Sequence, residues 1–527
     1  MSIIPGSSQP YALTLDKFID HAAKWHPGKG VVTASEDGQN TYLPYDTLRD
    51  RARAISTRLR HEGAKTGECV ATLAWNTQAH MECWYAIMGI GAVCHTLNPR
   101  LPVETLADMV AQSQARILIA SADQEQLAAG IAARCPSLDT IFVIDGKAEW
   151  STPQPGVRIL SLDVDADVAP AEWGGFDENA PCGLCFTSGT TGAPKGVTYT
   201  HRGIFLHTLR QLQADVAGIV EADVVLPAVP MFHANGWGLP FACPAVGASL
   251  VLPGRRTDGA SLAALIARHG VTIAVGVPTV WLDLFDHAER EGIELPSLKR
   301  LMVGGASMPE ALSRRILARG IEVQQTWGMT ELSPLGTAIR PGTGHGASRA
   351  SGTPALGLDL LLMDHEGVPI SEQRGKEGRL HVRGPSVVEC YFGERTPATA
   401  DGWFDTGDLA VIDGSGSVEI TGRSKDLIKS GGEWVNPVEL ETVVGSLDGI
   451  RKVAVIPRSH PKWGERPVLI VELADGASMS DAELLDPLRS RFAKWWLPDD
   501  IIRVASMPLA TTGKIDKRQL RSEYGTQ

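Results

Sequence analysis

The sequence predicts an α/β protein with a large N-terminal domain of layered sheets and helices and a smaller α+β C-terminal domain. Over the first 400 residues, apolar stretches of strand type alternate with amphipathic stretches of helical type. This alternation is typical of parallel sheets covered by helices. Beyond residue 400 the pattern changes to a hairpin and then to a separate unit. A chain of 527 residues is also too long for one ordinary core.

The N-terminal elements can be followed along the chain. We expect residues 69–75 (CVATLAW) to form a buried strand, 79–93 a closely packed helix and 116–122 the next strand. Residues 261–278 read as a helix, a glycine stop and a strand, and 298–306 as a strand that ends in glycines. Ligands of such sheets bind at the carboxyl ends of the strands.

The C-terminal part begins after a predicted hairpin. Residues 402–423 alternate in polarity around the turn sequence DGSG. The segment from Lys425 onward starts a new helix and new strands, KVAVIPR and PVLIVEL among them. We therefore predict a hinge near Lys425, an N-terminal domain of residues 1–424 and a C-terminal domain of residues 425–527.

Composition limits the class of protein. Hydrophobic residues make up 43% and charged residues 21% of the chain, as in soluble globular proteins. We find no apolar run long enough for an integral membrane span and no secretory signal, and the eight cysteines are scattered. A cytoplasmic protein is expected. The formal net charge of −12 argues against a nucleic-acid partner. A homodimer is left open.

The loop FTSGTTGAPKGV, residues 186–197, favours phosphate binding. It holds three glycines, four hydroxyl side chains and one lysine, so free N–H groups and hydroxyls can surround an anion. A P-loop NTPase requires glycine before the lysine and Ser or Thr after it. Here Pro194 and Gly196 flank Lys195, which excludes that motif. A mobile surface loop is the alternative from composition alone.

Two other patterns suggest metal or redox chemistry and are interpreted as structural. The CGLC stretch at residues 182–185 has CxxC spacing, but it lies in an apolar strand without a second Cys/His pair. We expect it to be core. The 14 histidines show no paired zinc spacing.

Four further motifs accompany the loop. They are GMTE at 328–331, GWFDTGD ending at residue 408, GRSKDLIKSGGEWVNPVELE at 422–441 and TTGKIDK at 511–517. In this order the five motifs resemble the adenylate-forming acyl-CoA synthetase superfamily, relatives of firefly luciferase. Four segments that contain tryptophan are most similar to the fatty acyl-CoA and methylthiopropionate-CoA ligase branch. They are FHANGWGLPF, TWGMTE, SGGEWV and KWWLPDD. The resemblance implies a ligase of fatty acid metabolism with ATP, CoA and Mg²⁺: the acid and ATP give an acyl-adenylate and pyrophosphate, and CoA then displaces AMP.

The resemblance also implies roles for single residues at the phosphates. Thr330 would contact the α-phosphate, next to Gly328 of the same motif, and Glu331 would hold Mg²⁺, a cation that prefers oxygen ligands. The residues that would hold the β- and γ-phosphates are Thr187, Ser188, Gly189, Thr190, Thr191 and Lys195.

For the nucleoside, Asp408 would accept hydrogen bonds from the ribose hydroxyls, with Arg423 in support. The residues that would enclose the adenine are Gly304, Gly305 and Ala306 on one ring face and Trp327, where many relatives carry Tyr, on the other.

The catalytic lysine of the family corresponds to Lys514, which would bridge the substrate carboxylate and ATP. Lys425 would be the hinge about which the small, mobile domain turns after adenylation. The residues that would then border the CoA channel are Gly432, Glu433 and Trp434.

The acyl pocket is expected next to PMFHANGWG. His233 would gate the site, and Trp237 and Trp327 would shorten the pocket. We therefore expect a short- or medium-chain fatty or methylthio acid with an apolar tail. An aryl- or cinnamate-type CoA ligase and a non-catalytic protein that binds acyl-AMP or nucleotide remain the alternatives.

Overall fold

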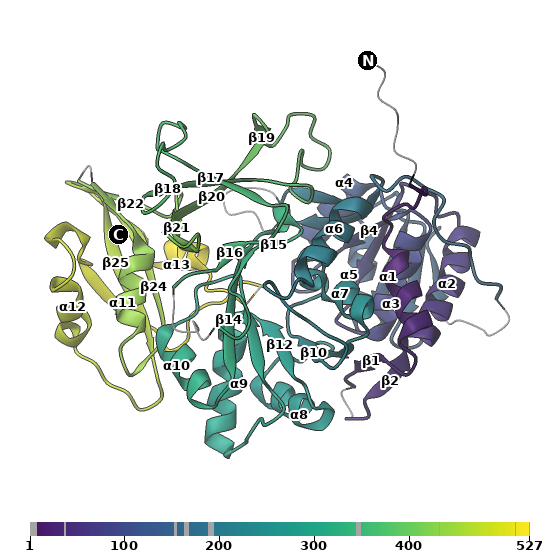
Figure 1. Cartoon of the computed structure of the whole chain (residues 1–527), viewed down its shortest axis with the longest axis horizontal. Helices are drawn as coiled ribbons and strands as arrows, with labels where there is room; N and C mark the ends of the chain where they lie inside the picture. Colours follow the sequence, from purple (N-terminus) through teal and green to yellow (C-terminus); the bar gives the residue numbers. More distant parts are fainter. Residues whose placement is uncertain are drawn as a thin grey trace.

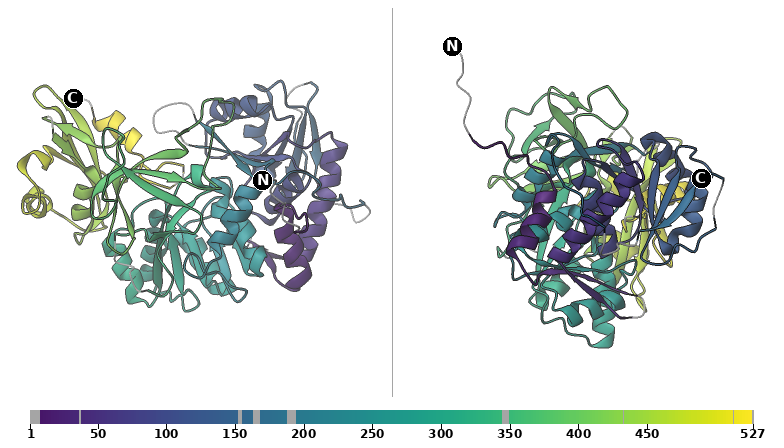
Figure 2. Two further views of the ribbon diagram at one scale, coloured as in Figure 1. Left: turned by 45° about the horizontal axis from the view of Figure 1, so that its top comes forward. Right: turned by 90° about the vertical axis from the view of Figure 1, so that its right-hand side faces the viewer.

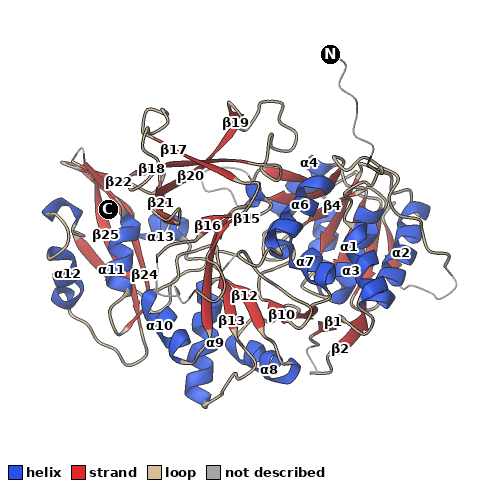
Figure 3. Ribbon diagram, in the orientation of Figure 1, coloured by secondary structure: helices blue, strands red, loops and turns tan. Residues whose placement is uncertain are grey.

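In the computed structural model, the described residues are 8–525 apart from 36–37, 152–154, 163–167, 188–193, 344–348, 432 and 512. They form two large sheets, a smaller third sheet and a C-terminal unit with its own sheet (Figure 1). Helices lie against both large sheets (Figure 3). The C-terminal strands and helices lie at one end of the molecule, and α1–α3 lie at the other (Figure 2).

The first large sheet has seven strands in the order β7-β6-β5-β3-β4-β8-β9. All neighbours are parallel except β8 and β9, which form an antiparallel pair. The strands are β3 (Cys69–Leu73), β4 (Val93–Thr96), β5 (Ile117–Ser121), β6 (Thr140–Ile144), β7 (Arg158–Ser161), β8 (Pro181–Phe186) and β9 (Gly196–Thr200).

The second large sheet has nine strands in the order β16-β15-β14-β13-β12-β10-β11-β1-β2. Its centre, from β14 to β1, is parallel, and the outer strands are antiparallel. The strands are β1 (Gly30–Thr33), β2 (Thr41–Pro44), β10 (Val224–Pro227), β11 (Ser249–Leu252), β12 (Ile273–Gly276), β13 (Arg300–Val303), β14 (Glu322–Gly328), β15 (Leu335–Ala338) and β16 (Thr353–Pro354).

Helices lie between the two sheets and outside each of them. One apolar cluster joins inner helices to both sheets, with Trp84 and Phe241 beside Val70 of one sheet and Leu250 of the other. The inner helices are α1 (Asp16–Trp25), α2 (Tyr45–His61), α3 (Gln78–Gly89), α6 (His201–Gln211) and α7 (Leu239–Val246). Separate clusters hold the outer helices α4 (Val103–Ser113), α5 (Glu125–Ala132), α8 (Gly259–His269), α9 (Pro278–Glu291) and α10 (Glu310–Ala318).

Local sequence explains where several helices begin and end. Asp258 caps α8 by accepting a hydrogen bond from the Ser261 backbone N–H, and Gly270, at φ 64°, ends that helix. The predicted helix 79–93 is too long at its C-terminus. It ends at Gly89, because Gly91 takes a left-handed φ of 74° and the chain enters β4 at Val93.

The third sheet contains the predicted hairpin. Its strands β20 (Trp403–Ile412) and β21 (Val418–Arg423) pair antiparallel, as residues 402–423 predict. The other strands of this sheet are β17 (Asp359–Met363), β18 (Glu377–Arg383) and β19 (Thr399–Ala400).

The C-terminal unit buries both faces of its own sheet. Val455, Leu469 and Val471 face α11 and α12, whereas the alternating Ala454 and Ile456 face α13. Its elements are β22 (Ile428–Ser430), β23 (Glu433–Val435), α11 (Pro437–Gly445), β24 (Ile450–His460), β25 (Gly464–Leu473), α12 (Asp481–Arg489), β26 (Asp500–Arg503) and α13 (Lys517–Tyr524). The position of the domain boundary, 424/425, stays a prediction.

Membrane and cysteine predictions can be compared with the structure. In the ranges that the structure describes, no helix is long and apolar enough to cross a membrane. All eight cysteines are free. Cys182 and Cys185 are buried in β8, as expected for core residues.

The inner helix layer yields a stability prediction. Trp84 on α3 is fully buried, and its indole N–H donates to Nε2 of His80 at 3.0 Å. Replacing it with Ala should lower the free energy of unfolding by about 3–5 kcal/mol, since the core cannot refill the space. Trp25 is 61% exposed, and Trp25→Ala should change stability by less than about 0.5 kcal/mol. Urea unfolding followed by fluorescence measures both, and equal losses would contradict the assigned core.

Candidate active site

The predicted phosphate loop joins two paired strands. Phe186 at the end of β8 is in register with Gly196 at the start of β9. The Thr187 backbone N–H donates to the Lys195 carbonyl at 2.9 Å, so the two ends of the loop are held together. Ser188, Gly189, Thr190 and Thr191 lie outside the described residues. The strand that the sequence predicts before the loop is found as β8.

Two further predicted segments follow neighbouring strands of the nine-stranded sheet. Gly304, Gly305 and Ala306 follow β13, and Gly328 ends β14. Gly304 leaves no room for a side chain: a Cβ there would lie 2.7 Å from Thr326 Oγ1 and 3.0 Å from Cη2 of Trp237. The ring of Trp237 therefore lies against the glycine segment predicted to contact adenine.

Asp408 is the best-satisfied carboxylate of the site. It lies on β20 with a side chain only 4% exposed. The Trp327 indole N–H donates to Oδ2 at 2.8 Å, and Arg423 on the adjacent strand β21 donates from Nε to Oδ1 at 2.9 Å. Burial raises the pKa of Asp408, and Arg423 and Trp327 oppose that rise. Each oxygen keeps a second lone pair, so it can accept another hydrogen bond from a ligand.

Glu331 has a partner that the sequence analysis did not anticipate. The Tyr391 hydroxyl donates to Glu331 Oε1 at 3.0 Å. The ammonium of Lys195 lies 4.5 Å from the centre of the Tyr391 ring. Thr330, buried beside Glu331, has its carbonyl bound by the Tyr199 hydroxyl at 3.0 Å. Tyr391 therefore connects the phosphate-loop lysine to the predicted metal ligand, and no local motif marks it.

The residues around Glu331 fit a magnesium ion bound jointly with substrate phosphates. One oxygen of this buried carboxylate is bound by Tyr391, which leaves the other for a cation. Within the described part of the chain, no group of three His, Cys, Asp or Glu side chains could hold a metal without substrate. A single carboxylate completed by phosphate oxygens and water is a usual protein site for Mg²⁺.

Lys514 reaches this site from the C-terminal unit. A Cβ at Gly305 would lie 3.0 Å from Cε and 3.6 Å from Nζ of Lys514. Burial, together with the positive charge of Arg423, lowers the pKa of Lys514 to about 8, while Asp408 acts in the opposite direction. The lysine that was predicted to act on the substrate carboxylate therefore lies among the predicted nucleotide-binding residues.

His233 and Trp237 flank a strained turn. The four residues Ala234 to Trp237 have φ between 44° and 54°, and Gly238 follows at 76°. Left-handed φ is costly for residues with a side chain, by about 1–2 kcal/mol each. The Gln211 amide supports the turn by donating to the Trp237 carbonyl at 3.0 Å. Burial, with nearby Lys514, lowers the pKa of His233 to about 4, so this histidine is neutral at pH 7.

Three predicted residues lie away from this group. Lys425 is exposed between β21 and β22. Glu433 and Trp434 lie on the exposed β22–β23 hairpin, where Trp434 is 54% exposed and Lys429 lies 5.4 Å from its ring. Gly432 lies outside the described residues.

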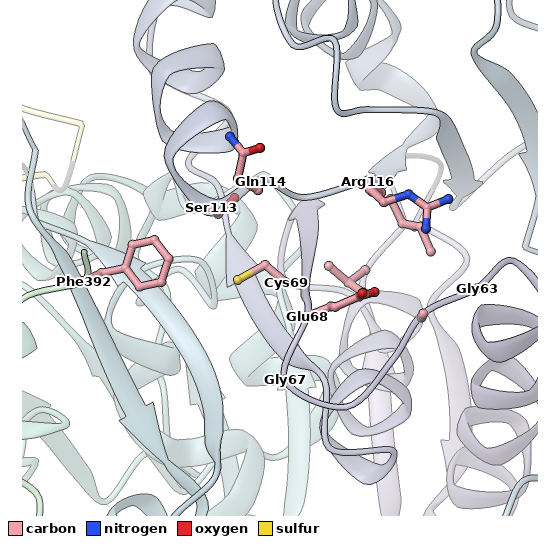
Figure 4. A pocket seen from close by; sticks show the side chains of 11 residues that line it. Gly63, Gly67, Glu68, Cys69, Ser113, Gln114, Arg116 and Phe392 are labelled. Carbon is pink, nitrogen blue, oxygen red and sulfur yellow. The ribbon is translucent and has the colours of Figure 1, made fainter.

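A pocket of about 290 Å³ lies apart from the predicted residues (Figure 4). Cys69 and Arg116 line it at the starts of β3 and β5, and Phe392 forms a wall. The Phe392 backbone N–H donates to the Gly196 carbonyl at 2.7 Å. Phe392 thus connects the pocket wall to the end of the phosphate loop, but the pocket holds none of the predicted side chains.

Comparison with known proteins agrees with this geometry. Residues 19–392 match the family model described as AMP-binding enzyme, and residues 439–514 match the AMP-binding enzyme C-terminal domain. The chain is 39% identical to a 3-methylmercaptopropionyl-CoA ligase of Ruegeria lacuscaerulensis over 98% of both chains. It is 37% identical to a medium-chain-fatty-acid–CoA ligase of Ectopseudomonas oleovorans over 97% of this chain and 96% of that protein.

The fold is also shared with a solved structure, an anthranilate CoA ligase in complex with anthranoyl-AMP. The TM-score is 0.85 at 25% identity, over 99% of both chains. The chain therefore belongs to the AMP-binding enzyme family. Within that family it is an AMP-forming acyl-CoA ligase, which confirms the class and the branch predicted from the five motifs. ATP and CoA are substrates of these ligases.

The lowered pKa of Lys514 predicts a pH dependence. If the lysine acts as an ammonium ion, kcat/KM for pyrophosphate release should fall as pH rises through about 8, approaching tenfold per pH unit. His233 does not produce this decline, because burial lowers its pKa to about 4 and it is already neutral across this range. Initial rates between pH 6.5 and 10 measure it.

A matched variant, Lys514→Arg, keeps the positive charge across this range because guanidinium stays protonated. Its residual rate should not decline near pH 8. The same decline in both proteins would assign it to another group.

Proposed function

We propose that this ligase activates a short- or medium-chain acid with an apolar tail, with Lys514 as the cation that brings the acid and ATP together. The observation that carries the proposal is the placement of Lys514 against Gly305, beside the Asp408–Trp327–Arg423 group. The partly buried ammonium of Lys514 would therefore face both the carboxylate of the acid and the phosphates of ATP, which are both anionic. We expect the reaction to take place in the cytoplasm, since free cysteines suit a reducing compartment.

In the first half-reaction, a carboxylate oxygen of the acid attacks the α-phosphorus of ATP, and the bond to the β-phosphate oxygen breaks. Acid, nucleotide and leaving pyrophosphate are all anionic, so catalysis depends on positioning and charge neutralisation. Lys514 would orient the acid, Thr330 would donate to the α-phosphate and Asp408 would hold the ribose. A magnesium ion on Glu331 would neutralise the phosphates when bound.

The partners of Asp408 support its role with ribose. Trp327 and Arg423 fix both carboxylate oxygens before any ligand arrives, so no side-chain ordering is needed on binding. The larger indole at position 327 provides a stacking surface for adenine, and its N–H is already used by Asp408.

In the second half-reaction, the CoA thiol attacks the acyl carbon and AMP leaves. We propose that residues 425–527 turn about Lys425, which would withdraw Lys514 and bring the β22–β23 hairpin to the acyl-adenylate. The exposure of Lys425, Glu433 and Trp434 supports this proposal.

The identity of the acid is inferred from Trp237 and from two relatives. The Trp237 ring lies on Gly304, and a bulky indole at the predicted acyl pocket would favour short chains. The Ruegeria and Ectopseudomonas relatives are named for 3-methylmercaptopropionyl-CoA and medium-chain fatty acids. An aryl acid is the second candidate, because the matched solved structure holds anthranoyl-AMP.

A substrate panel tests the proposal. Acids of two to sixteen carbons, 3-methylthiopropionate and aryl acids would be supplied with ATP, Mg²⁺ and CoA, and AMP and pyrophosphate would be measured. We expect both products with short or medium aliphatic acids, and none without Mg²⁺. ADP as the main product would contradict the adenylate mechanism, and preference for aryl acids would favour the second candidate.

Trp237→Ala should shift the preference toward longer acids. Removing the indole opens apolar volume, and each CH₂ that becomes buried gains roughly 0.8 kcal/mol, or about fourfold in kcat/KM. The KM for ATP should change little. The measurement is kcat/KM across the aliphatic series, with Trp25→Ala, at an exposed position on α1, as the control. An unchanged chain-length profile would remove Trp237 from the pocket wall.

A further inference from the structure

The tip of the lysine-bearing hairpin is a tight structure within the C-terminal unit. Leu509 and Ile515 form an antiparallel bridge. Inside it, the Ala510 backbone N–H donates to the Lys514 carbonyl at 2.7 Å, and the Gly513 N–H donates to the Ala510 carbonyl at 2.8 Å. The hairpin therefore fixes Lys514 relative to its own unit. It does not by itself fix Lys514 relative to the nucleotide-binding residues.

Three side chains of the N-terminal body bind the tip of this hairpin. Asn98 donates from Nδ2 to Thr511 Oγ1 at 3.2 Å, and Arg100 donates from Nη1 to the Thr511 carbonyl at 3.0 Å. From the opposite side, the Thr279 hydroxyl donates to the Gly513 carbonyl at 2.6 Å. These bonds hold Thr511 and Gly513, the two described residues nearest to Lys514 on its N-terminal side.

The binding groups are themselves held in place. Asn98 accepts a hydrogen bond from the Arg100 backbone N–H at Oδ1, 3.0 Å away, which directs its amide nitrogen toward Thr511. The Arg100 guanidinium lies 5.7 Å from the centre of the Trp75 ring. The Trp75 indole N–H in turn donates to Asp123 at 2.9 Å. Preformed donors of this kind lose little freedom when they bind.

The hairpin also packs closely against Val277 on the Thr279 side. Gly513 has φ 82°, a conformation that residues with a side chain rarely adopt. A Cβ there would lie 3.2 Å from Cγ2 of Val277, which precedes α9. A Cβ at Gly305 would meet the other methyl of Val277 at 3.3 Å and Lys514 Cε at 3.0 Å. Val277 therefore packs both against Gly513 and against Gly305, the residue beside which Lys514 lies.

We propose that Asn98, Arg100 and Thr279 are positioning residues for the first half-reaction, holding the hairpin tip so that Lys514 stays inserted beside Gly305. The proposal rests on the role of Lys514 proposed above. In this role the three residues act through the placement of one ammonium group, and not through contact with the substrate or the nucleotide. Their three bonds also have to break before Lys514 can leave the site.

The experiment compares single and double variants in the two half-reactions. Asn98→Ala, Arg100→Ala and Thr279→Val each remove one hydrogen bond to the hairpin tip, and a net hydrogen bond corresponds to roughly two- to tenfold in an equilibrium constant. We expect pyrophosphate release in the first turnover to slow by roughly threefold or more in each variant. Arg100→Lys, which keeps a cationic donor, should recover most of the loss. Transfer from supplied acyl-adenylate to CoA should not slow.

The decisive comparison is with Lys514→Ala. If the three residues act only through Lys514, the same substitutions should change the residual pyrophosphate rate of Lys514→Ala by less than about 1.5-fold. An equal loss in both backgrounds would overturn the proposal, as would wild-type rates in all three variants. An unimpaired Lys514→Ala protein would instead refute the proposed role of Lys514 itself, so the two failures are distinguishable.

Asp286→Ala is the matched control for general contact between the units. Asp286 on α9 pairs with Arg451 of the C-terminal unit at 3.5 Å. After the substitution, Arg451 still has an ion pair with Glu472, 3.4 Å away. Arg315 still has an ion pair with Glu289, 2.7 Å away. We expect less than a twofold change in pyrophosphate release. A loss equal to that of Thr279→Val would show that any weakening of the interface has the same effect, and would overturn the positioning role.

Discussion

The site depends on one buried carboxylate that has to be neutralised. A carboxylate withdrawn from water is unfavourable unless charges and donors surround it. Asp408 on the third sheet obtains its partners from β14 of the nine-stranded sheet, through Trp327, and from β21, through Arg423. The electrostatic effect of Asp408 extends to Lys514 of the C-terminal unit. Satisfying this one group brings together elements that are far apart in the chain.

The left-handed turn before α7 shows a different kind of constraint. Ala234 and Trp237 adopt left-handed φ values that residues with a side chain, apart from Asn and Asp, rarely take. Such strain persists only where surrounding contacts fix the backbone. Here the Gln211 bond to the Trp237 carbonyl and the close packing of Trp237 on Gly304 provide those contacts. The indole is therefore held where it borders the site by contacts on both its backbone and its ring.

The sequence was sufficient for features with a local signature. The strand before the phosphate loop, the core position of Cys182 and Cys185 and the hairpin of residues 402–423 all depend on neighbouring residues. The predicted helix at 79–93 is too long, because the apolar run continues into a strand and only Gly89 and Gly91 interrupt it. Motif order was sufficient for the class of enzyme.

Contacts between distant residues left no such signature. The hydrogen bond between Tyr391 and Glu331 joins positions 60 residues apart, and the one between Trp327 and Asp408 joins positions 81 residues apart. The bonds of Asn98, Arg100 and Thr279 to the hairpin tip span still longer separations. Tyr391, Asn98, Arg100 and Thr279 are ordinary in their local context, so only the folded chain reveals what they contact.

The way in which the C-terminal unit packs has a thermodynamic consequence. Each buried apolar cluster among the described residues lies wholly on one side of residue 424. Separating the two units would therefore expose little apolar surface. It would mainly replace a few hydrogen bonds and ion pairs with contacts to water. Heat capacity rises mainly when apolar surface is wetted. Such a separation would leave the heat capacity of the protein nearly unchanged, so the enthalpy of separation would be nearly the same at every temperature.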